Sequence, residues 1–275
     1  MSLRRALRSA AMLFLFGIFF LASLAAGCLA LLLRLLFPRD RRRAELMTRG
    51  IARGALRLTV RLAGLLRVFR VSAEGECPAS CRGLVIAANH PALTDYMVLA
   101  SVLPADMACV VSGRLLKGFM GPVIRGMGYI GNSLPPEEWK ERIDPSDGIL
   151  IFPEGTRSAH NGWRIILRRG AANLSLRLGR DILPVYITCS VRGFLGTGFL
   201  SLRAPEEVPL FTVRFGKRIS PEAFLKEGVP VPVAARRLTS LLERMLARET
   251  GAEVAHGADS TGAAGTGESR VESQE

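Results

Sequence analysis

The feature that most constrains this 275-residue chain is an uncharged apolar run near its N-terminus. The run extends from Ala10 to Leu33, and as a helix it is long enough to cross the roughly 30 Å of hydrocarbon in a bilayer. A secretory signal is the alternative, because Ala25–Cys28 looks like a lipoprotein cleavage site. Apolar sequence resumes at Leu29–Leu36, however, where a cleaved signal would give way to polar sequence. The run therefore predicts a membrane-associated helix.

The charge balance of the chain points to an anionic partner. Lys and Arg number 37 against 24 Asp and Glu, and the charged residues after position 248 are mostly acidic, so the rest of the chain is strongly basic. Membranes and nucleic acids are both anionic, but the apolar run favours a membrane and no nucleic-acid partner. Arginines flank the run, with the larger cluster on its C-terminal side: Arg4, Arg5 and Arg8 before it, and Arg34, Arg39, Arg41, Arg42 and Arg43 after it. By the positive-inside rule we expect the body on the cytoplasmic face, which in a bacterium is the cytoplasmic face of the inner membrane.

Residues 44–69 predict a second helix, on which arginine recurs every four residues at Arg49, Arg53, Arg57 and Arg61. Most of the aliphatic side chains lie off this arginine stripe. Such a helix can rest in the headgroup layer, with its apolar side toward lipid and its guanidinium groups toward phosphates. The alternative is a helix packed on the domain with a solvated charged face. Because an apolar helix comes directly before it, we favour the membrane interpretation.

Beyond residue 66, short apolar runs alternate with helical stretches, which is typical of an α/β domain. The expected strands are 68–73, 84–88, 107–112, 148–152, 182–187, 198–203 and 210–215, and the expected helices are 92–102, 114–125, 136–142, 164–178 and 233–248. From Gly251 onward the composition cannot bury a core and predicts a disordered tail. We therefore divide the chain into a membrane-associated helical segment at 1–66, an α/β domain at 67–248 and a tail at 249–275.

The five cysteines predict neither a disulfide framework nor a zinc site. Their number is odd, and Cys77 and Cys81 form a single C-x3-C without a second pair. Cys28 lies inside the apolar run. This usage favours a reducing compartment, and we expect no metal centre.

The segment from Leu84 to Asp95 is the first that carries chemistry. An apolar strand runs directly into Asn89-His90-Pro91, which places His90 at the carboxyl end of the strand, a common position for ligand sites in open α/β sheets. Because Pro91 suits the first turn of a helix, we expect Asp95 about one turn into that helix with its carboxylate directed at the imidazole. Such a pair would select one tautomer and stabilise the imidazolium that forms when His90 accepts a proton. The alternative is a helix-capping histidine beside an ordinary helix-start carboxylate.

The second segment, from Gly148 to Ser158, is another apolar strand that stops in a polar loop. Gly155 can adopt a positive φ, while Thr156, Ser158 and Arg157 offer donors for an oxyanion. This loop would make a good phosphate cradle. A plain Pro-Glu-Gly turn is the alternative interpretation.

Together these segments resemble the first and third motifs of the lysophospholipid acyltransferase family, whose bacterial type is 1-acylglycerol-3-phosphate acyltransferase. His90 is followed by Asp95 at the spacing of the first motif, and residues 152–158 read Phe-Pro-Glu-Gly-Thr-Arg-Ser, as in the third. The resemblance covers roughly 68–224. It implies a glycerolipid acyltransferase-like fold, an α/β domain with a mixed sheet flanked by helices, preceded by an N-terminal membrane-docking hairpin.

What the resemblance implies about activity is direct transfer of a fatty acyl group from acyl-CoA or acyl carrier protein to the hydroxyl of a lysophospholipid, most directly 1-acylglycerol-3-phosphate, in contact with membrane lipids. No further cofactor is implied. His90 would be the general base and Asp95 would orient it. The acceptor would be bound by a group of four residues, with the last on its phosphate: Glu154, Gly155, Thr156 and Arg157.

One position departs from the family. The second motif usually ends in arginine, and here residues 126–132 end in Asn132. An amide cannot match the charge of a guanidinium that holds phosphate. Either a neighbouring cation compensates, for which Arg114, Lys117 and Arg125 are candidates, or the acceptor is a different one, such as a lyso-aminolipid or a specialised acyl lipid.

Two other function classes remain as alternatives. A catalytically silent, membrane-bound binder of anionic lipid would explain the arginines but has no need of the His90–Asp95 pair. A serine hydrolase is disfavoured because no G-x-S-x-G sequence occurs.

Overall fold

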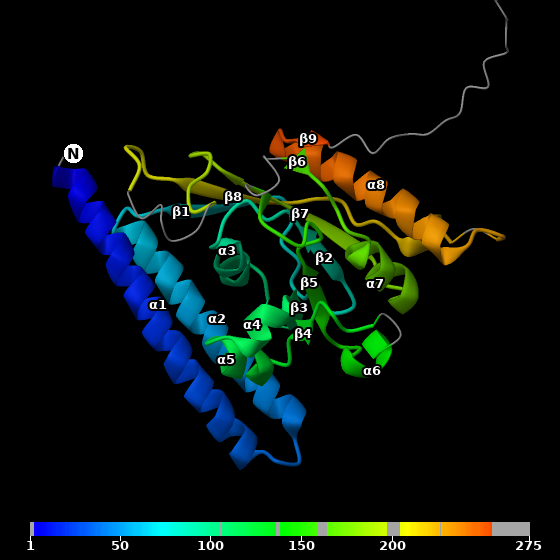
Figure 1. Ribbon diagram of the computed structural model, residues 1–275, viewed down its shortest axis with the longest axis horizontal. Coiled ribbons are helices and arrows are strands. Elements are labelled where there is room, and N and C mark those ends of the chain that lie inside the picture. The colour runs from blue at the N-terminus through cyan, green and yellow to red at the C-terminus, as the bar shows by residue number, and fades with distance from the viewer. Residues whose placement is uncertain are drawn as a thin grey trace, which may run out of the picture.

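The computed structural model describes residues 3–104, 106–135, 138–158, 164–196, 204–225 and 227–254. It opens with a hairpin of two long helices, α1 (Leu3–Leu36) and α2 (Arg41–Leu65), which run side by side along one flank of the domain (Figure 1). Asp40 caps α2 by accepting a hydrogen bond from the Arg43 amide at 2.9 Å. The helical hairpin expected from the sequence is confirmed, although both helices differ in length from the expected ranges.

Within the described residues, the domain is built on a seven-stranded sheet with the order β1-β8-β7-β2-β5-β3-β4. Its strands are β1 (Arg70–Glu74), β2 (Val85–Ala88), β3 (Met107–Val111), β4 (Ile130–Gly131), β5 (Gly148–Ile151), β7 (Ile182–Cys189) and β8 (Leu210–Phe215). The pairing of β7 with β8 is antiparallel and the other pairings are parallel, so the sheet is mixed, as expected. The adjacent strands β2 and β5 are parallel, and they therefore end at the same edge of the sheet.

Helices cover both faces of this sheet, which explains why its central strands are continuous apolar runs rather than alternating ones. On one face, Ile86 and Ala88 of β2 join a core that includes side chains of α1, α2 and α3 (Asp95–Val102). On the other face, Val85 and Ala87 pack in a core with α7 (Gly170–Leu178) and α8 (Val231–Thr250). The hairpin is thus one of the two layers that bury the sheet (Figure 1).

Several elements differ from the expected ranges. The helix expected at 114–125 is two short helices, α4 (Gly113–Lys117) and α5 (Gly121–Gly126), separated at Gly118, where the chain leaves helical conformation. The helix expected at 136–142 covers Trp139–Arg142 (α6), and a 3-10 turn spans Pro221–Ala223 (η4). The helix expected at 164–178 begins at Gly170, because Arg164–Ile165 (β6) pairs with Glu253–Val254 (β9).

This β6–β9 pairing also bears on the expected tail, because regular structure continues past residue 248 to residue 254. Helix α8 itself extends to Thr250 and ends at Gly251, which has a positive φ of 65°. The strand expected at 198–203 and the tail from 255 onward lie outside the described residues.

The orientation of α2 corrects both interpretations of its arginine stripe. Arg49 is only 3% exposed, and it bonds Asp147 Oδ1 at 2.7 Å and the Met127 carbonyl at 2.6 Å. Arg57 donates to the Ser101 carbonyl at 2.9 Å. At Arg49 and Arg57 the stripe therefore binds the domain rather than lipid phosphates, while Arg57 is half-buried and Arg61 is exposed. The reason is that Asp147, itself 3% exposed, needs a cationic partner inside the fold.

Several apolar side chains of α2 consequently face outward, with Leu58 57% and Leu65 78% exposed, while Leu56 and Ala63 pack in the core. Helix α1 also exposes a broad apolar surface, which includes Leu13, Phe14, Leu21, Leu24, Leu31, Leu32 and Leu35. In a water-soluble monomer a continuous apolar face of this extent is uncommon and marks an interaction site.

Candidate active site

His90 is held at the carboxyl end of β2 by the residue before it. The Asn89 side chain accepts from the Ile187 amide at 2.7 Å and donates to the Ile187 carbonyl at 2.8 Å, which ties the end of β2 to β7. Asn89 is 2% exposed, so its amide satisfies two main-chain groups that water cannot reach. His90 therefore leaves the sheet from a fixed point.

Asp95 bonds the imidazole as the sequence predicts, but from a different place in its helix. His90 Nδ1 lies 2.8 Å from Asp95 Oδ2, and the same oxygen accepts the Ala92 amide at 2.7 Å. Asp95 is the first residue of α3, with Thr94 at the N-cap, because Pro91 starts a non-helical loop rather than the first turn. The expectation that Asp95 lies one turn into the helix is wrong, and the contact is made by a local loop.

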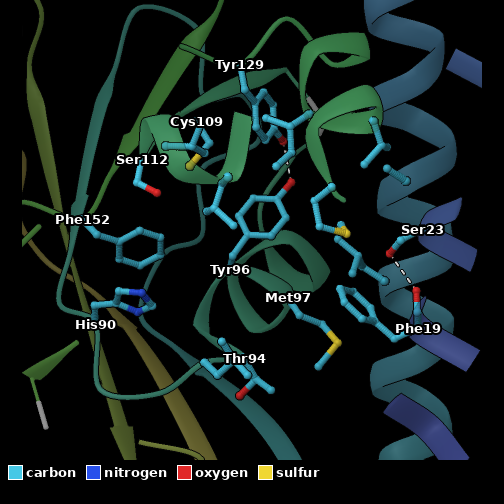
Figure 2. Close-up of a pocket in the computed structure, with 18 of the residues that line it drawn as sticks. Phe19, Ser23, His90, Thr94, Tyr96, Met97, Cys109, Ser112, Tyr129 and Phe152 are labelled. Atoms are coloured by element: carbon cyan, nitrogen blue, oxygen red, sulfur yellow. Dashed lines mark hydrogen bonds between the residues drawn. The ribbon is translucent and has the colours of Figure 1, made fainter. Parts of the chain in front are cut away.

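Burial dominates the electrostatics of this carboxylate. Asp95 is 0% exposed, which raises its pKa, while the hydrogen bonds from His90 and Ala92 and the charges of His90 and Arg157 act in the opposite direction. Since Nδ1 is bonded to Asp95, the ring nitrogen that remains for a ligand is Nε2. The ring itself stacks on Phe152, with centroids 4.4 Å apart and planes at 25° (Figure 2).

The third-motif segment reaches His90 from the end of β5. Glu154 Oε1 accepts the His90 amide at 2.8 Å and the Ser158 hydroxyl at 3.0 Å, and the Ser158 amide donates to the His90 carbonyl at 2.8 Å. Glu154 is 3% exposed, and burial raises its pKa. Two hydrogen bonds thus join the two motifs, which lie about sixty residues apart in sequence, and the Ser158–Glu154 bond braces the third-motif turn itself.

An apolar cavity of about 970 Å³ opens beside His90. Aliphatic and aromatic side chains from α1, α2 and α3 form much of its wall, among them Phe16 and Leu56. Phe19 and Met97 on the same wall are labelled in Figure 2. This volume is at the upper end of the range for small-molecule sites and is suited to a long hydrocarbon chain. The helical hairpin and His90 therefore line the same space.

The cavity also carries positive charge. Arg114, Arg157 and Arg168 line it, and the described residues on its wall include no Asp or Glu. Arg157 Nη1 is buried and has no hydrogen-bond partner within the described part of the chain. A buried guanidinium nitrogen in this state is suited to receive an anionic ligand group.

The expected acceptor-binding residues fall into two groups. Gly155, Thr156 and Arg157 line the cavity, and the Gly155 φ of 69° allows the turn that carries them. Glu154 is not among the lining residues, because its side chain points to the main chain of His90. The sequence therefore predicted Glu154 in the right segment but did not predict which way it points.

Asn132 lines the cavity, and its Oδ1 accepts the Gly113 amide at 3.3 Å. Of the three cations considered as compensation, Arg114 lines the cavity, whereas Lys117 and Arg125 do not. Arg125 instead donates to the Leu116 carbonyl. The sequence did not indicate a role for Arg168. Its side chain packs directly against Gly155, because a β-carbon added at Gly155 would lie only 2.9 Å from Arg168 Nε. Its position just before α7 gave no signal of that contact.

A hydroxyl pair was also missed. Tyr96 and Tyr129 line the cavity and hydrogen-bond to each other at 2.5 Å (Figure 2). Burial raises the pKa of both phenols, so both are protonated. The sequence signal for this pair was absent because the two residues lie in different elements. Among the described residues, no group of three or more His, Cys, Asp or Glu side chains is arranged to hold a metal ion.

With the fold and the site in place, comparison with known proteins assigns the class. Residues 70–188 match the family model described as Acyltransferase, a span that holds both β2 with His90 and β5 with Glu154. This segment is therefore an acyltransferase-like domain, and the chain is an acyltransferase-like enzyme. No curated protein sequence matches the chain.

The whole architecture, hairpin included, is similar to that of a solved enzyme. The crystal structure of the 1-acyl-sn-glycerophosphate (LPA) acyltransferase PlsC from Thermotoga maritima superimposes with a TM-score of 0.62, covering 90% of this chain and 98% of that one. The sequences are 20% identical, so the match shows a shared fold. The recognised resemblance and the expected fold are confirmed.

Proposed function

We propose that this enzyme transfers a fatty acyl group from acyl-CoA or acyl carrier protein to the free hydroxyl of 1-acylglycerol-3-phosphate, giving phosphatidic acid. The observation that carries the proposal is the joint placement of an oriented histidine, an apolar cavity and three arginines. The cavity matches the hydrocarbon chain of a lipid substrate. The arginines match a phosphate, and His90 supplies the base.

In the proposed reaction, His90 Nε2 removes the proton of the acceptor hydroxyl as its oxygen attacks the thioester carbonyl carbon. The tetrahedral intermediate then collapses, the carbon–sulfur bond breaks, and the thiolate leaves with the proton from the imidazolium. Asp95, held at 2.8 Å from Nδ1, stabilises the imidazolium in between. General-base assistance of this kind supplies about 10² to 10⁴ in rate, and binding in the cavity supplies orientation.

The anionic headgroup would be held by Arg157, with Arg114 and Arg168 beside it. These guanidinium groups line the same cavity as Asn132, so a phosphate can be neutralised without an arginine at position 132. Gly155 and Thr156 add main-chain and hydroxyl donors on the same side. No carboxylate among the described lining residues opposes this arrangement.

A second candidate is the same chemistry on another acceptor, such as a lyso-aminolipid or a specialised acyl lipid. The observation in its favour is Asn132, whose amide lies on the cavity wall and can recognise a neutral polar group. A non-catalytic lipid binder is disfavoured by the buried Asp95, because a binding module has no need of an aspartate that bonds a histidine ring.

Membrane association belongs to the same proposal. Helix α1 is long and apolar enough to cross a bilayer. Both of its ends contact the domain, however: Arg5 and Arg8 donate to carbonyls of Ala204 and Pro205, and Arg34 donates to the Arg125 carbonyl. A spanning helix would carry its first turns to the far side of the membrane. We therefore place α1 along one leaflet, with the catalytic domain on the cytoplasmic side.

The experiment that tests the function is acyl transfer by membranes that contain the full-length protein. Labelled acyl-CoA and acyl carrier protein are offered with 1-acylglycerol-3-phosphate and with a panel of other lysolipids. The wild type should form phosphatidic acid, and His90→Ala should lower the rate by at least about 10²-fold. His256→Ala, a histidine outside the motif, is the matched control. Transfer at the wild-type rate by His90→Ala would overturn the mechanism, and transfer only to another lysolipid would select the second candidate.

A further inference from the structure

We propose that Glu154 is a positioning residue, which holds the main chain of His90 in place and does not touch the acceptor. The inference rests on the proposed function, in which His90 is the base. It also replaces the role that the family resemblance implied for this glutamate.

Glu154 Oε1 accepts two hydrogen bonds, from the His90 amide at 2.8 Å and from the Ser158 hydroxyl at 3.0 Å. The Ser158 amide in turn donates to the His90 carbonyl at 2.8 Å. Both main-chain polar groups of His90 are therefore bonded by one short turn that follows β5. The position of the imidazole consequently depends on that turn as well as on Asp95.

The side chain of Glu154 is turned away from the cavity. Its neighbours Pro153 and Gly155 line the cavity wall, whereas Glu154 does not and is 3% exposed. Its second oxygen, Oε2, has no hydrogen-bond partner among the described residues but is buried, so an acceptor in the cavity could reach the carboxylate only if the turn moved. The turn would also have to change, because the positive φ of Gly155 sets the direction of the residues around it.

The remaining constraints on His90 act on its ring and not on its main chain. Asp95 holds Nδ1, and Phe152 stacks on one face of the ring at 4.4 Å. Neither contact fixes the direction of the bond from Cα to Cβ, which the main chain sets. Since a displacement of about 1 Å at a reacting group can cost about 10²-fold in rate, the Glu154 contact is expected to affect catalysis strongly.

This role predicts a specific difference between two substitutions. In Glu154→Gln the amide oxygen can accept the same two hydrogen bonds, so most of the activity should remain. In Glu154→Ala the buried His90 amide loses its acceptor and the loop relaxes. An acceptor-binding carboxylate predicts a different pattern, because Gln and Ala would then both weaken acceptor binding and raise the acceptor KM.

The test is steady-state kinetics of the full-length enzyme in membranes, with 1-acylglycerol-3-phosphate as the varied acceptor. Glu154→Ala should lower kcat by about 10²-fold with the acceptor KM within about threefold of the wild type. Glu154→Gln should keep kcat within about threefold. Glu222→Gln, an exposed glutamate far from the motifs in sequence, is the matched control. An acceptor KM raised tenfold or more in Glu154→Gln, with kcat retained, would overturn the proposal.

A second readout does not depend on turnover. A proton held between His90 Nδ1 and Asp95 should give a downfield resonance in the proton NMR spectrum. The chemical shift of this resonance should stay the same in Glu154→Gln, and the resonance should shift or broaden in Glu154→Ala. If the wild type transfers acyl groups to none of the lysolipids, the proposed function fails while this signal still decides the role of Glu154. An unchanged signal in a folded Glu154→Ala protein would overturn that role. If Glu154→Ala does not fold, the kinetics of Glu154→Gln decide it.

Discussion

Helices α2 and α8 are both amphipathic and arginine-rich, and they pack on the domain in opposite orientations. In α8, Leu242 is 1% exposed and packs in the core, while Arg236 and Arg237 are exposed. In α2, Arg49 is 3% exposed and Leu58 is 57% exposed. The two helices lie on opposite faces of the same sheet (Figure 1).

An amphipathic pattern therefore does not by itself determine which face of a helix packs against the domain. Helix α8 follows the rule for water, with its apolar stripe on the core. Helix α2 meets a buried carboxylate, Asp147, on the domain side, and its outward apolar face adjoins that of α1. The inverted orientation is stable where the outward face meets lipid, since lipid removes the cost of exposing leucine to water.

The largest difference in stability is expected when one arginine on each helix is replaced by alanine. Arg49→Ala should lower the free energy of unfolding by about 3 to 4 kcal/mol, because it removes one of the two arginines that bond the buried Asp147 carboxylate and also the buried donor to the Met127 carbonyl. Arg237→Ala should change it by less than about 0.5 kcal/mol, since its side chain is on the surface. Denaturant unfolding of the full-length protein in detergent micelles measures both. Equal effects of the two substitutions would show that α2 is not inverted in solution.

A smaller effect is expected from leucine on the same two helices. Leu242→Ala should destabilise the fold by about 2 to 3 kcal/mol, because it leaves a cavity between α8 and the sheet. Leu58→Ala should cost less than about 0.5 kcal/mol in the same unfolding measurement, since its side chain already lies outside the core. If Leu58→Ala proved as costly as Leu242→Ala, α2 would bury its leucines against protein.

The smallest effect concerns the bilayer and sharpens the assignment of the outward face. Leu58→Ala should weaken partitioning into vesicles that contain anionic lipid by about 1 kcal/mol, or about fivefold, because it removes apolar area from the lipid-facing side. Arg237→Ala serves as the control on α8, where partitioning should not change. Flotation of the purified protein with such vesicles measures the ratio. Undiminished flotation of Leu58→Ala would remove Leu58 from the membrane contact.

The sequence predicted those secondary-structure elements whose positions depend mainly on residues close together in the chain. The strand before His90 and the strand before Glu154 were found within one residue of their observed limits, and the apolar run at 10–33 lies inside α1, which extends beyond it at both ends. These signals are local, because hydrophobic period, glycine and proline act over one or two turns. The pairing of His90 with Asp95 was also local, although the loop that makes it was taken for a helix.

What the sequence determined by itself was therefore the chemistry: a histidine and an aspartate at a fixed spacing, a Pro-Glu-Gly turn, and a long apolar segment ahead of them. The tertiary structure decided in which direction the functional and buried side chains point. It turned Glu154 toward the His90 amide, brought Arg168 into the cavity from before α7, and turned Arg49 inward to meet Asp147. The physical reason is that the partners of Glu154 and Arg49 lie tens of residues away in sequence. The direction in which such a side chain points to find its ion pair or hydrogen bond is set only when distant elements pack.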